Sequence, residues 1–304
     1  MAEAQYAFAQ DLPSSISPVT ENKKYHIKQR EVVMLSSLRP RAMRQLQRKW
    51  LHTVRREGQP GTLDCRYFFY DSLGRKQSPW HHVPLYAPAA LEHPQELASA
   101  AVFHFVNEIP RGSREKMEIA GKEEFNPIKQ DERKGAPRLY HSASLVNYGC
   151  LPQTWEDPNH VDAATKHGGD NDPVDVCEIG SRVAAIGEVY PVKVLGVLGM
   201  IDGGETDWKV IAINVNDPLA PHVNDLRDLR DTPLHDVVGQ VHRWFRDYKI
   251  PDGKPPSDFA FNGEAQPRDF AVEVIQQTHE SWKQLVGDEL AFNTKLWTCT
   301  RTDM

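Results

Sequence analysis

The chain has 304 residues, of which 39% are hydrophobic, and a formal net charge of -6. This length and composition can bury one large core or two ordinary ones, and no low-complexity region is present. The acidic balance argues against a general binder of nucleic acids or anionic membranes, which normally carries a basic face. No apolar run reaches about 18 residues and no secretory signal pattern starts the chain, so we expect neither a membrane span nor secretion.

The cysteines are widely spaced and form no C-x-x-C motif: Cys65, Cys150, Cys177 and Cys299. Such spacing predicts neither a zinc site nor a disulfide framework, and it favours a reducing compartment. We therefore expect a cytoplasmic protein. An organellar location is the alternative if the basic N-terminal region acts in targeting.

Residues 28–58 differ in charge from the rest of the chain. They hold nine Lys or Arg against two Glu, which gives +7 here and leaves -13 elsewhere. An apolar stripe recurs at helical spacing, at Met43, Leu46, Trp50 and Val54. The segment is therefore predicted to contain a basic, amphipathic helix.

A Gly-Gln-Pro-Gly stretch at 58–61 indicates a boundary between an N-terminal extension, residues 1–58, and a main domain, residues 59–304. Three interpretations of the extension are open. A cleaved presequence is disfavoured by the acids that precede the basic stretch, and a disordered tail would leave the apolar stripe exposed. We favour a helix docked on the domain or on a second subunit.

The next part of the chain has strand patterns. Residues 63–80 read as a hairpin with a turn at 71–74, and residues 101–110 read as a strand that brings Glu108 to one face. Alternation also places Lys116 and Glu118 on one face. Further β-rich runs follow at 192–201 and 208–215.

Two helices are predicted near the end of the chain. In the first, Thr232 is the expected cap and Pro233 lies in the first turn. Its apolar face consists of Val237, Val238, Val241, Trp244, Phe245 and Tyr248. The second starts near Pro267 and is expected to bury Phe270, Val274, Ile275, Trp282 and Leu285. Strands followed by helices predict an α+β fold, a β-barrel with helices packed outside.

Three aspartates fall within six residues behind a Gly-Gly pair: Asp170, Asp172 and Asp175, in GGDNDPVDVCEIG. Two carboxylates about 4 Å apart at an effective dielectric of about 20 repel by roughly 4 kcal/mol, so a fixed cluster needs water or cations. The glycines at 168 and 169 leave backbone room for something bulky to approach. A solvated acidic turn explains this stretch equally well.

A second acidic cluster, Asp202, Glu205 and Asp207 in DGGETDWK, also lies beside a Gly-Gly pair. The β-rich runs on either side place Asp202 to Asp207 in the loop that joins adjacent strands. Two oxygen-rich clusters favour Mg²⁺, Mn²⁺ or Ca²⁺, because zinc and copper prefer nitrogen or sulfur ligands.

Basic and phenolic side chains accompany these acids: Lys116, Arg138, Tyr148, Lys209, Tyr248 and Lys249. Carboxylates can hold hard cations while these groups hold a polyanion against them, as phosphoryl transfer requires. Each basic residue alone is more simply explained as a solvated surface charge. Only the whole set of basic and phenolic groups together with the acids indicates phosphoryl transfer.

The stretch GGDNDPVDVCEIG closely resembles the D-x-D-P-x-D signature of family I soluble inorganic pyrophosphatases of the eukaryotic type. The likeness covers about residues 63–286. It continues through NEIPRGSREKMEI, NYGCLPQTWEDP, DGGETDWKVIAINVNDPLAP, WFRDYKIPDGKP and FAFNGEA. The resemblance implies a five-stranded, OB-like β-barrel with surrounding helices, a site in its mouth, a homodimer, and hydrolysis of pyrophosphate with several Mg²⁺ ions, for which Mn²⁺ or Zn²⁺ can substitute.

The resemblance also implies ligands for these ions: Asp170, Asp175, Asp207, Asp202 and Glu118. The first ion would take Asp170, Asp175 and Asp207, and Asp175 would also reach the second. Asp202 and Asp207 would bind a third ion that arrives with substrate, and Glu118 would serve the fourth.

Asp172 would be the general base, acting on a water between two ions, with no covalent intermediate. The phosphates would be held by Lys116, Arg138, Tyr148, Lys209, Tyr248 and Lys249, of which the first three also count as catalytic. A supporting acidic shell would consist of Glu108, Glu156, Asp157 and Glu205.

One departure from the family pattern is Ser144, where the eukaryotic branch usually has Tyr, and residues 137–147 are several residues shorter. We therefore expect a different loop at the rim of the site. The competing functions are a hydrolase of short polyphosphates or nucleotides, an OB-type module for single-stranded nucleic acid, and a catalytically silent homologue.

Overall fold

The computed structural model describes residues 52–87, 101–287 and 294–299. The strands are β1 (Thr53–Glu57), β2 (Arg66–Tyr70), β3 (Lys76–Gln77), β4 (Val102–Ile109), β5 (Met117–Ile119), β6 (Ile128–Gln130), β7 (Glu132–Arg133), β8 (Ala136–Pro137), β9 (Asn147–Cys150), β10 (Asp175–Glu178), β11 (Val189–Asp202), β12 (Glu205–Asn214), β13 (Asp258–Phe259) and β14 (Gln266–Pro267). The α-helices are α5 (Val237–Asp247) and α6 (Arg268–Gly287), and short 3₁₀ helices are η1 (Ala220–His222), η2 (Leu226–Asp231), η3 (Ile250–Asp252) and η4 (Ala260–Gly263).

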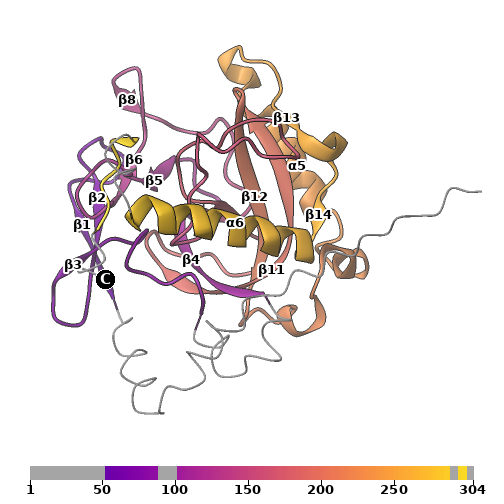
Figure 1. Cartoon of the computed structure of the whole chain (residues 1–304), viewed down its shortest axis with the longest axis horizontal. Coiled ribbons are helices and arrows are strands. Elements are labelled where there is room, and N and C mark those ends of the chain that lie inside the picture. The colour runs from indigo at the N-terminus through magenta and orange to yellow at the C-terminus, as the bar shows by residue number, and fades with distance from the viewer. Residues whose placement is uncertain (1–51, 88–100, 288–293, 300–304) are drawn as a thin grey trace, which may run out of the picture. The chain divides into compact units, whose positions relative to one another are not determined.

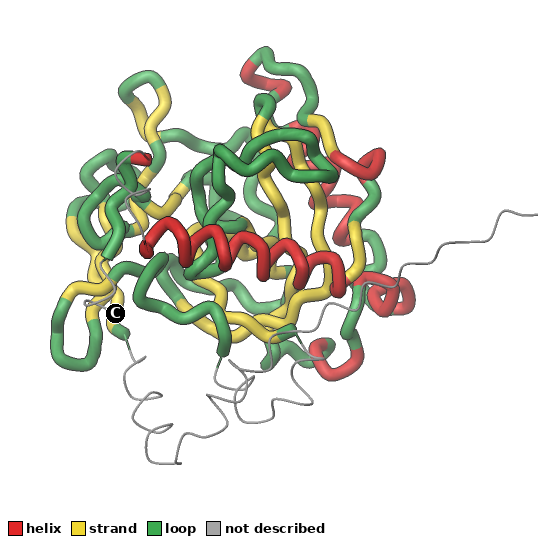
Figure 2. The backbone as a smooth tube through the Cα atoms, viewed as in Figure 1, coloured by secondary structure: helices red, strands yellow, loops and turns green. Residues whose placement is uncertain are grey.

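Five strands close into a ring in the order β12, β10, β9, β4 and β11, because β11 pairs back onto β12. The pair β10–β12 is parallel and the other four pairs are antiparallel. A second sheet has the order β1, β2, β6 and β5, with β3 on β2 (Figures 1 and 2). The chain therefore has a mixed architecture of sheets and few helices built around a ring of strands.

The ring buries both faces of its strands, which explains why all eight residues of β4 are buried. Val106 and Ile109 pack in one hydrophobic cluster, while Phe103 and Phe105 pack in another. The second cluster includes Ala271, Val274 and Ile275 of α6, which runs across the ring strands in Figure 1. Alternation along a strand thus fills two separate apolar layers.

The predicted strands are confirmed with one change in the second acidic cluster. β2 and β3 form the expected hairpin, and its turn is closed by Asp71, whose Oδ1 accepts from the amide of Leu73. Asp202 ends β11 and Asp207 lies inside β12, where Asp202 is paired with Glu205. The prediction of a loop from Asp202 to Asp207 is wrong, because only Gly203 and Gly204, both at positive φ, make the turn.

Both predicted helices are present, but the cap of the first was misplaced. Thr232 is the C-cap of η2, and α5 begins after Asp236. The hydroxyl of Thr232 donates to the carbonyl of Leu229, so it finishes one helix rather than starting the next. α6 starts directly after Pro267, as predicted, and all its predicted core residues pack in the two clusters.

The predicted basic helix is wrong at Val54, which lies in β1 and is paired with Phe69 of β2. A β-branched residue next to a hairpin gains a cross-strand partner that the helical pattern did not anticipate. The other stripe positions, Met43, Leu46 and Trp50, lie outside the described residues.

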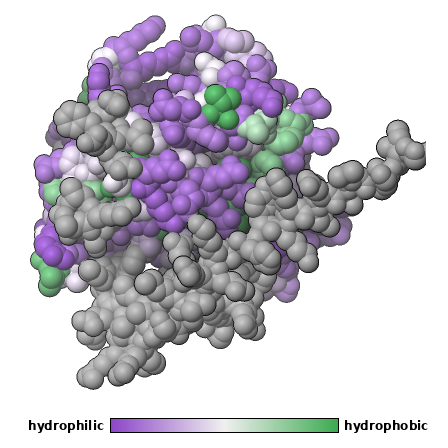
Figure 3. Space-filling model, viewed as in Figure 1, coloured by the Kyte–Doolittle hydropathy of each residue, from purple (hydrophilic) through white to green (hydrophobic). Residues whose placement is uncertain are grey.

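The surface on the side of Figure 3 is mainly hydrophilic over the described residues, with small, separate apolar areas. Among the helices that the structure describes, none has the length and apolar content needed to cross a membrane. All four cysteines are buried, and Cys65, Cys150 and Cys177 are free thiols.

Candidate active site

A polar, open cleft with about 930 Å³ of empty space collects most of the predicted site residues. Fourteen of the sixteen line it: Glu108, Lys116, Glu118, Arg138, Tyr148, Asp170, Asp172, Asp175, Asp202, Glu205, Asp207, Lys209, Tyr248 and Lys249. They come from β4, β5, β9, β10, β11 and β12, from the residues just before β5 and just after β8, from the loop before β10, and from the end of α5. The cleft therefore exists only when the ring is closed.

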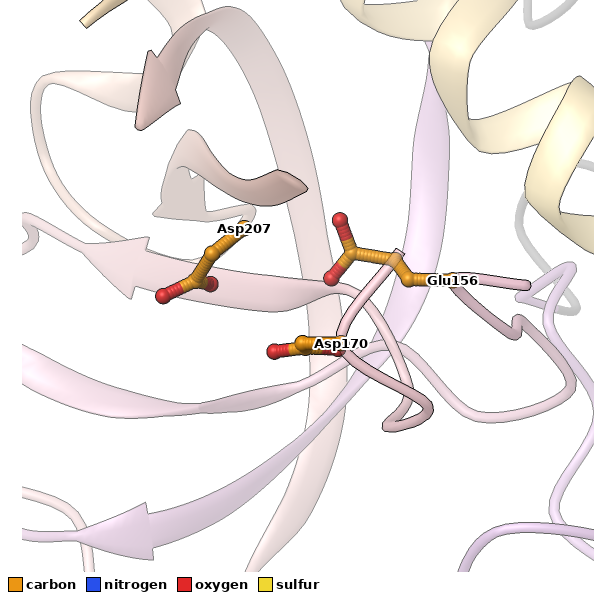
Figure 4. Close-up of side chains that lie close together, drawn as sticks. All are labelled: Glu156, Asp170 and Asp207. Carbon is orange, nitrogen blue, oxygen red and sulfur yellow. The ribbon is translucent and has the colours of Figure 1, made fainter. Parts of the chain in front are cut away.

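Three acidic side chains, Glu156, Asp170 and Asp207, lie close together beside the cleft (Figure 4). One oxygen from each lies within 4.8 Å of the others. Oε1 of Glu156 accepts from the amide of Trp208 at 2.9 Å, while Oε2 is buried with no hydrogen-bond partner. A buried, unpartnered carboxylate oxygen beside two more acids fits a hard cation.

The Gly-Gly pair brings Asp170 to this cluster by close backbone packing. A Cβ on Gly169 would lie 2.2 Å from the carbonyl carbon of Glu156, and one on Gly168 would lie 2.2 Å from the carbonyl oxygen of Pro158. The sequence prediction that these glycines make room for a bulky group is therefore corrected: the neighbouring backbone fills that room. The carbonyl of Gly168 also accepts from the amide of Thr206 at 2.7 Å, next to Asp207.

The acids of the cluster resist ionisation together. Burial raises the pKa of Glu156 and of Asp170 well above the usual range, and the nearest negative neighbours raise both further. Burial also raises the pKa of Asp207 to about 7, although Lys209 opposes the rise. A bound cation would remove this repulsion, so the cluster fits a metal site in its charge as well as its geometry.

Lys209 is the cation that the protein itself places among these acids. Its side chain is 2% exposed, and its Nζ donates to Oδ2 of Asp175 at 2.5 Å and to Asp207. It also donates to the hydroxyl of Tyr148 at 2.9 Å. Residue 209 is directly paired with Asp175 across the parallel β10–β12 ladder, and Asp207 lies two residues before it, so the strand register assembles the group.

The other predicted lysines are also paired with acids. Nζ of Lys249 donates to Oδ2 of Asp202 at 2.5 Å, and the hydroxyl of Tyr248 donates to the same oxygen at 2.8 Å. Lys116, the residue before β5, donates to Glu118 within β5, so the two side chains lie on one side of the chain as predicted. The cleft thus holds acids and bases in pairs. A polyanion could take the place of the acids beside the bases, and its counter-cations could take the place of the bases beside the acids.

Glu108 enters the cleft because of a bulge. The pairing of β4 with β9 shifts between Asn107 and Ile109, which frees Glu108 from the ladder. Its Oε1 accepts from the amide of Ile119 at 2.7 Å. Burial, and then the charge of Asp175, raises the pKa of Glu108 well above its usual range.

Asp172 and Glu205 differ from the other acids of the cleft because both are exposed, and the carboxylate of Asp172 accepts no hydrogen bond within the described residues. Loss of surrounding water, and then Glu118, raises the pKa of Asp172. Contact with the solvent of the cleft limits the rise of the Asp172 pKa, and the carboxylate can accept a proton.

Two residues that the sequence analysis associated with the site lie outside the lining of the cleft. Asp157 does not line the cleft, and its Oδ1 accepts from the amide of Asn159 at 2.8 Å in a local turn. Ser144 is buried and lies away from the cleft lining, where its Oγ donates to the carbonyl of Val146 at 2.7 Å. It lines a small apolar cavity next to the cleft instead.

The sequence reasoning missed two residues of the site. Asp131 accepts from Arg138 at 3.0 Å and lies 3.2 Å from Nζ of Lys116, so it orients both basic groups. Tyr140 lines the cleft and is 6% exposed. No sequence pattern singled out either residue. Asp131 lies in a connection rich in charged residues, and Tyr140 lies in residues 137–147, the segment that is shorter than the family pattern.

Acids that can hold cations, with basic and phenolic groups beside them, define an enzyme that acts on phosphate compounds with the help of divalent ions. Comparison with known proteins agrees with this class of enzyme. The profile of the family "Inorganic pyrophosphatase" matches residues 105–283. The chain belongs to the inorganic pyrophosphatase family and is a hydrolase.

The chain is 48% identical over 250 residues to an inorganic pyrophosphatase of Homo sapiens, covering 81% of this chain and 82% of that relative. It also resembles the solved inorganic pyrophosphatase of Schistosoma japonicum, with a TM-score of 0.71, 45% identity, and 78% and 81% of the two chains covered. A truncated vacuolar soluble pyrophosphatase of Trypanosoma cruzi, solved in complex with PPi, has a TM-score of 0.70 and 42% identity, with 77% of this chain and 91% of that chain covered.

Proposed function

We propose that this protein hydrolyses inorganic pyrophosphate to two phosphates with Mg²⁺. The observation that carries the proposal is the cluster of Glu156, Asp170 and Asp207, whose oxygens lie within 4.8 Å of one another beside a cleft lined with basic groups. Membership of the pyrophosphatase family supports the choice of substrate.

The proposed metal ligands are Asp170, Asp175, Asp207, Asp202 and Glu118, with Mn²⁺ or Zn²⁺ as substitutes for Mg²⁺. Glu108, Glu156, Asp157 and Glu205 are proposed as the supporting shell. The unpartnered Oε2 of Glu156 makes this residue a candidate ligand as well. Bound Mg²⁺ would neutralise the phosphate oxygens and make a water molecule more acidic.

Asp172 is proposed as the general base, because its carboxylate opens to the cleft and has no internal partner. It accepts a proton from the attacking water, whose oxygen forms a bond to one phosphorus. The bond from that phosphorus to the bridging oxygen breaks, and the bridging oxygen leaves with the second phosphate. No covalent intermediate with the protein is needed.

The groups proposed to hold the phosphates are Lys116, Arg138, Tyr148, Lys209, Tyr248 and Lys249. In the free protein most of them are paired with carboxylates, as Lys249 is with Asp202. A cation that binds a carboxylate weakens its hold on the lysine, so the ammonium becomes available to the phosphate.

The proposal extends to the type of fold, the domain, the cellular location and the oligomeric state. The strand ring is interpreted as the OB-like barrel of the family, and residues 59–304 as the pyrophosphatase domain, with β1 of the extension added to its second sheet. The protein is proposed to be a cytoplasmic homodimer, and the free thiols of Cys65, Cys150 and Cys177 suit a reducing compartment.

The test is release of phosphate from pyrophosphate, tripolyphosphate and ATP by the purified protein. We expect turnover of pyrophosphate that chelator abolishes and Mg²⁺ restores, with inhibition by Ca²⁺, which is larger and less strict in geometry. Full activity without a divalent ion would refute the mechanism. Faster turnover of tripolyphosphate or ATP than of pyrophosphate would favour the competing hydrolase.

A further inference from the structure

Three tyrosines line the cleft, and two of them already donate hydrogen bonds to acids. The hydroxyl of Tyr148 donates to Asp175, and that of Tyr248 donates to Asp202 at 2.8 Å. Tyr140 is different, because its hydroxyl makes no hydrogen bond within the described residues. A polar group in a nearly buried side chain without a partner requires an explanation, and a ligand is one.

The ring of Tyr140 is held firmly in place. It is 6% exposed and meets Trp244 edge to face, with 4.8 Å between the ring centroids. Its amide donates to the carbonyl of Arg114 at 2.7 Å, and Nε of Arg114 donates back to the carbonyl of Tyr140 at 2.8 Å. The hydroxyl is therefore fixed before any ligand arrives, which lowers the entropy lost on binding.

The surroundings of this hydroxyl are suited to an anion. Tyr140 lies two residues after Arg138, whose carbonyl accepts from the amide of Lys116 at 3.1 Å, so these three residues are neighbours in the lining of the cleft. Burial raises the pKa of Tyr140 to about 12, against the opposing effects of Lys116 and Lys209. The phenol thus stays protonated at neutral pH and can donate a hydrogen bond.

We propose that the hydroxyl of Tyr140 is a substrate-binding group that donates a hydrogen bond to a phosphate oxygen beside Lys116 and Arg138 in the cleft. This assignment rests on the proposed function, and it adds a binding residue to that site. It also gives this hydroxyl a role that phenylalanine at the same position would lack.

The test compares Tyr140→Phe with Tyr190→Phe. Tyr190 is a matched control because it is also buried, but its hydroxyl donates to Glu178 at 3.0 Å, and it does not line the cleft. Removing the hydroxyl of Tyr140 should raise the KM for pyrophosphate about tenfold, the effect of losing one hydrogen bond to a charged group, with kcat within about twofold. Its Tm should be unchanged or higher, because no internal partner is lost.

The control should show the reverse pattern. Tyr190→Phe should lower the Tm and leave KM within about twofold of the wild type, because the buried Glu178 loses its donor and neither residue lines the cleft. If both variants raise KM equally, or if Tyr140→Phe lowers the Tm while KM is unchanged, the hydroxyl is structural and the proposal is overturned.

Calorimetric titration with inorganic phosphate in the presence of Mg²⁺ gives a readout that does not depend on turnover. Tyr140→Phe should weaken phosphate binding about tenfold, and Tyr190→Phe should not. Equal phosphate affinity in wild type and Tyr140→Phe would overturn the proposal. A wild-type protein that binds phosphate through Tyr140 but releases none from pyrophosphate would refute the proposed function alone.

Discussion

Nζ of Lys209 lies 2.5 Å from Oδ2 of Asp175 and also contacts Asp207, so one buried ammonium serves two of the proposed metal ligands. In the absence of divalent ions, this lysine is the main charge that keeps the two acids together. Burial and these two carboxylates act in opposite directions on its pKa, and the net result is a pKa well above the usual range.

Lys209→Met should therefore destabilise the metal-free protein by about 3 kcal/mol, because it leaves buried acids unpaired. Added Mg²⁺ should raise the Tm of this variant more than it raises that of the wild type. Thermal melts with chelator and with Mg²⁺ measure both effects. Lys193→Met is the control, because Nζ of Lys193 contacts Asn224 outside the cleft; equal Mg²⁺ shifts in all three proteins would contradict the expectation.

Asp172→Asn and Asp175→Asn should separate the roles of base and ligand. Asp172 makes no internal hydrogen bond through its carboxylate, so its replacement should lower kcat at least about 10²-fold and leave the Mg²⁺ requirement unchanged. Asp175→Asn should also raise the Mg²⁺ concentration needed for half-maximal rate. Identical behaviour of the two variants across a Mg²⁺ titration would show that this division of roles is wrong.

Ser144→Tyr should destabilise the protein rather than improve substrate binding. Ser144 is buried beside Tyr140 and Trp244, where little free space remains, and its Oγ donates to the carbonyl of Val146. An aromatic ring there must displace its neighbours, at a cost of about 1–3 kcal/mol.

Urea unfolding measures this cost, with Ser144→Ala as the control for the lost hydrogen bond. A tyrosine variant as stable as the wild type, with a lower KM, would show that the ring reaches the cleft after all.

His81 should make the protein sensitive to acid. Burial lowers the pKa of His81 to about 3, although the carbonyl of Trp297 opposes this at 3.0 Å. The unfolded chain takes up a proton near pH 6.5 and the folded chain does not, so this stabilising contribution is present above about pH 6.5 and lost as the pH falls toward 3. Between pH 7 and 5 the loss is about 2 kcal/mol.

His81→Gln isolates this effect, because the amide can still donate to Trp297 and accept from Trp282. The free energy of unfolding of the variant, measured in urea at several pH values with chelator present, should fall less toward pH 5 than that of the wild type. Parallel curves for the two proteins would exclude His81 as the source.

The sequence alone determined the types of most of the elements and the kinds of side chain in the site. Periodicity located β4, β11, β12 and both helices, because an apolar face leaves a regular mark on neighbouring residues. The acids beside the two Gly-Gly pairs and the accompanying bases indicated a site for cations and phosphate. These features are local, so a short stretch of residues carries the information.

Only the tertiary structure decided which of these residues meet. Lys209 is paired with Asp175 through the parallel ladder of β10 and β12, a contact between segments 34 residues apart. The role of Gly169 follows from the backbone of Glu156, and the position of Tyr140 follows from the ring of Trp244. Such contacts depend on strand register and packing between distant segments, and no local pattern in the sequence encodes them.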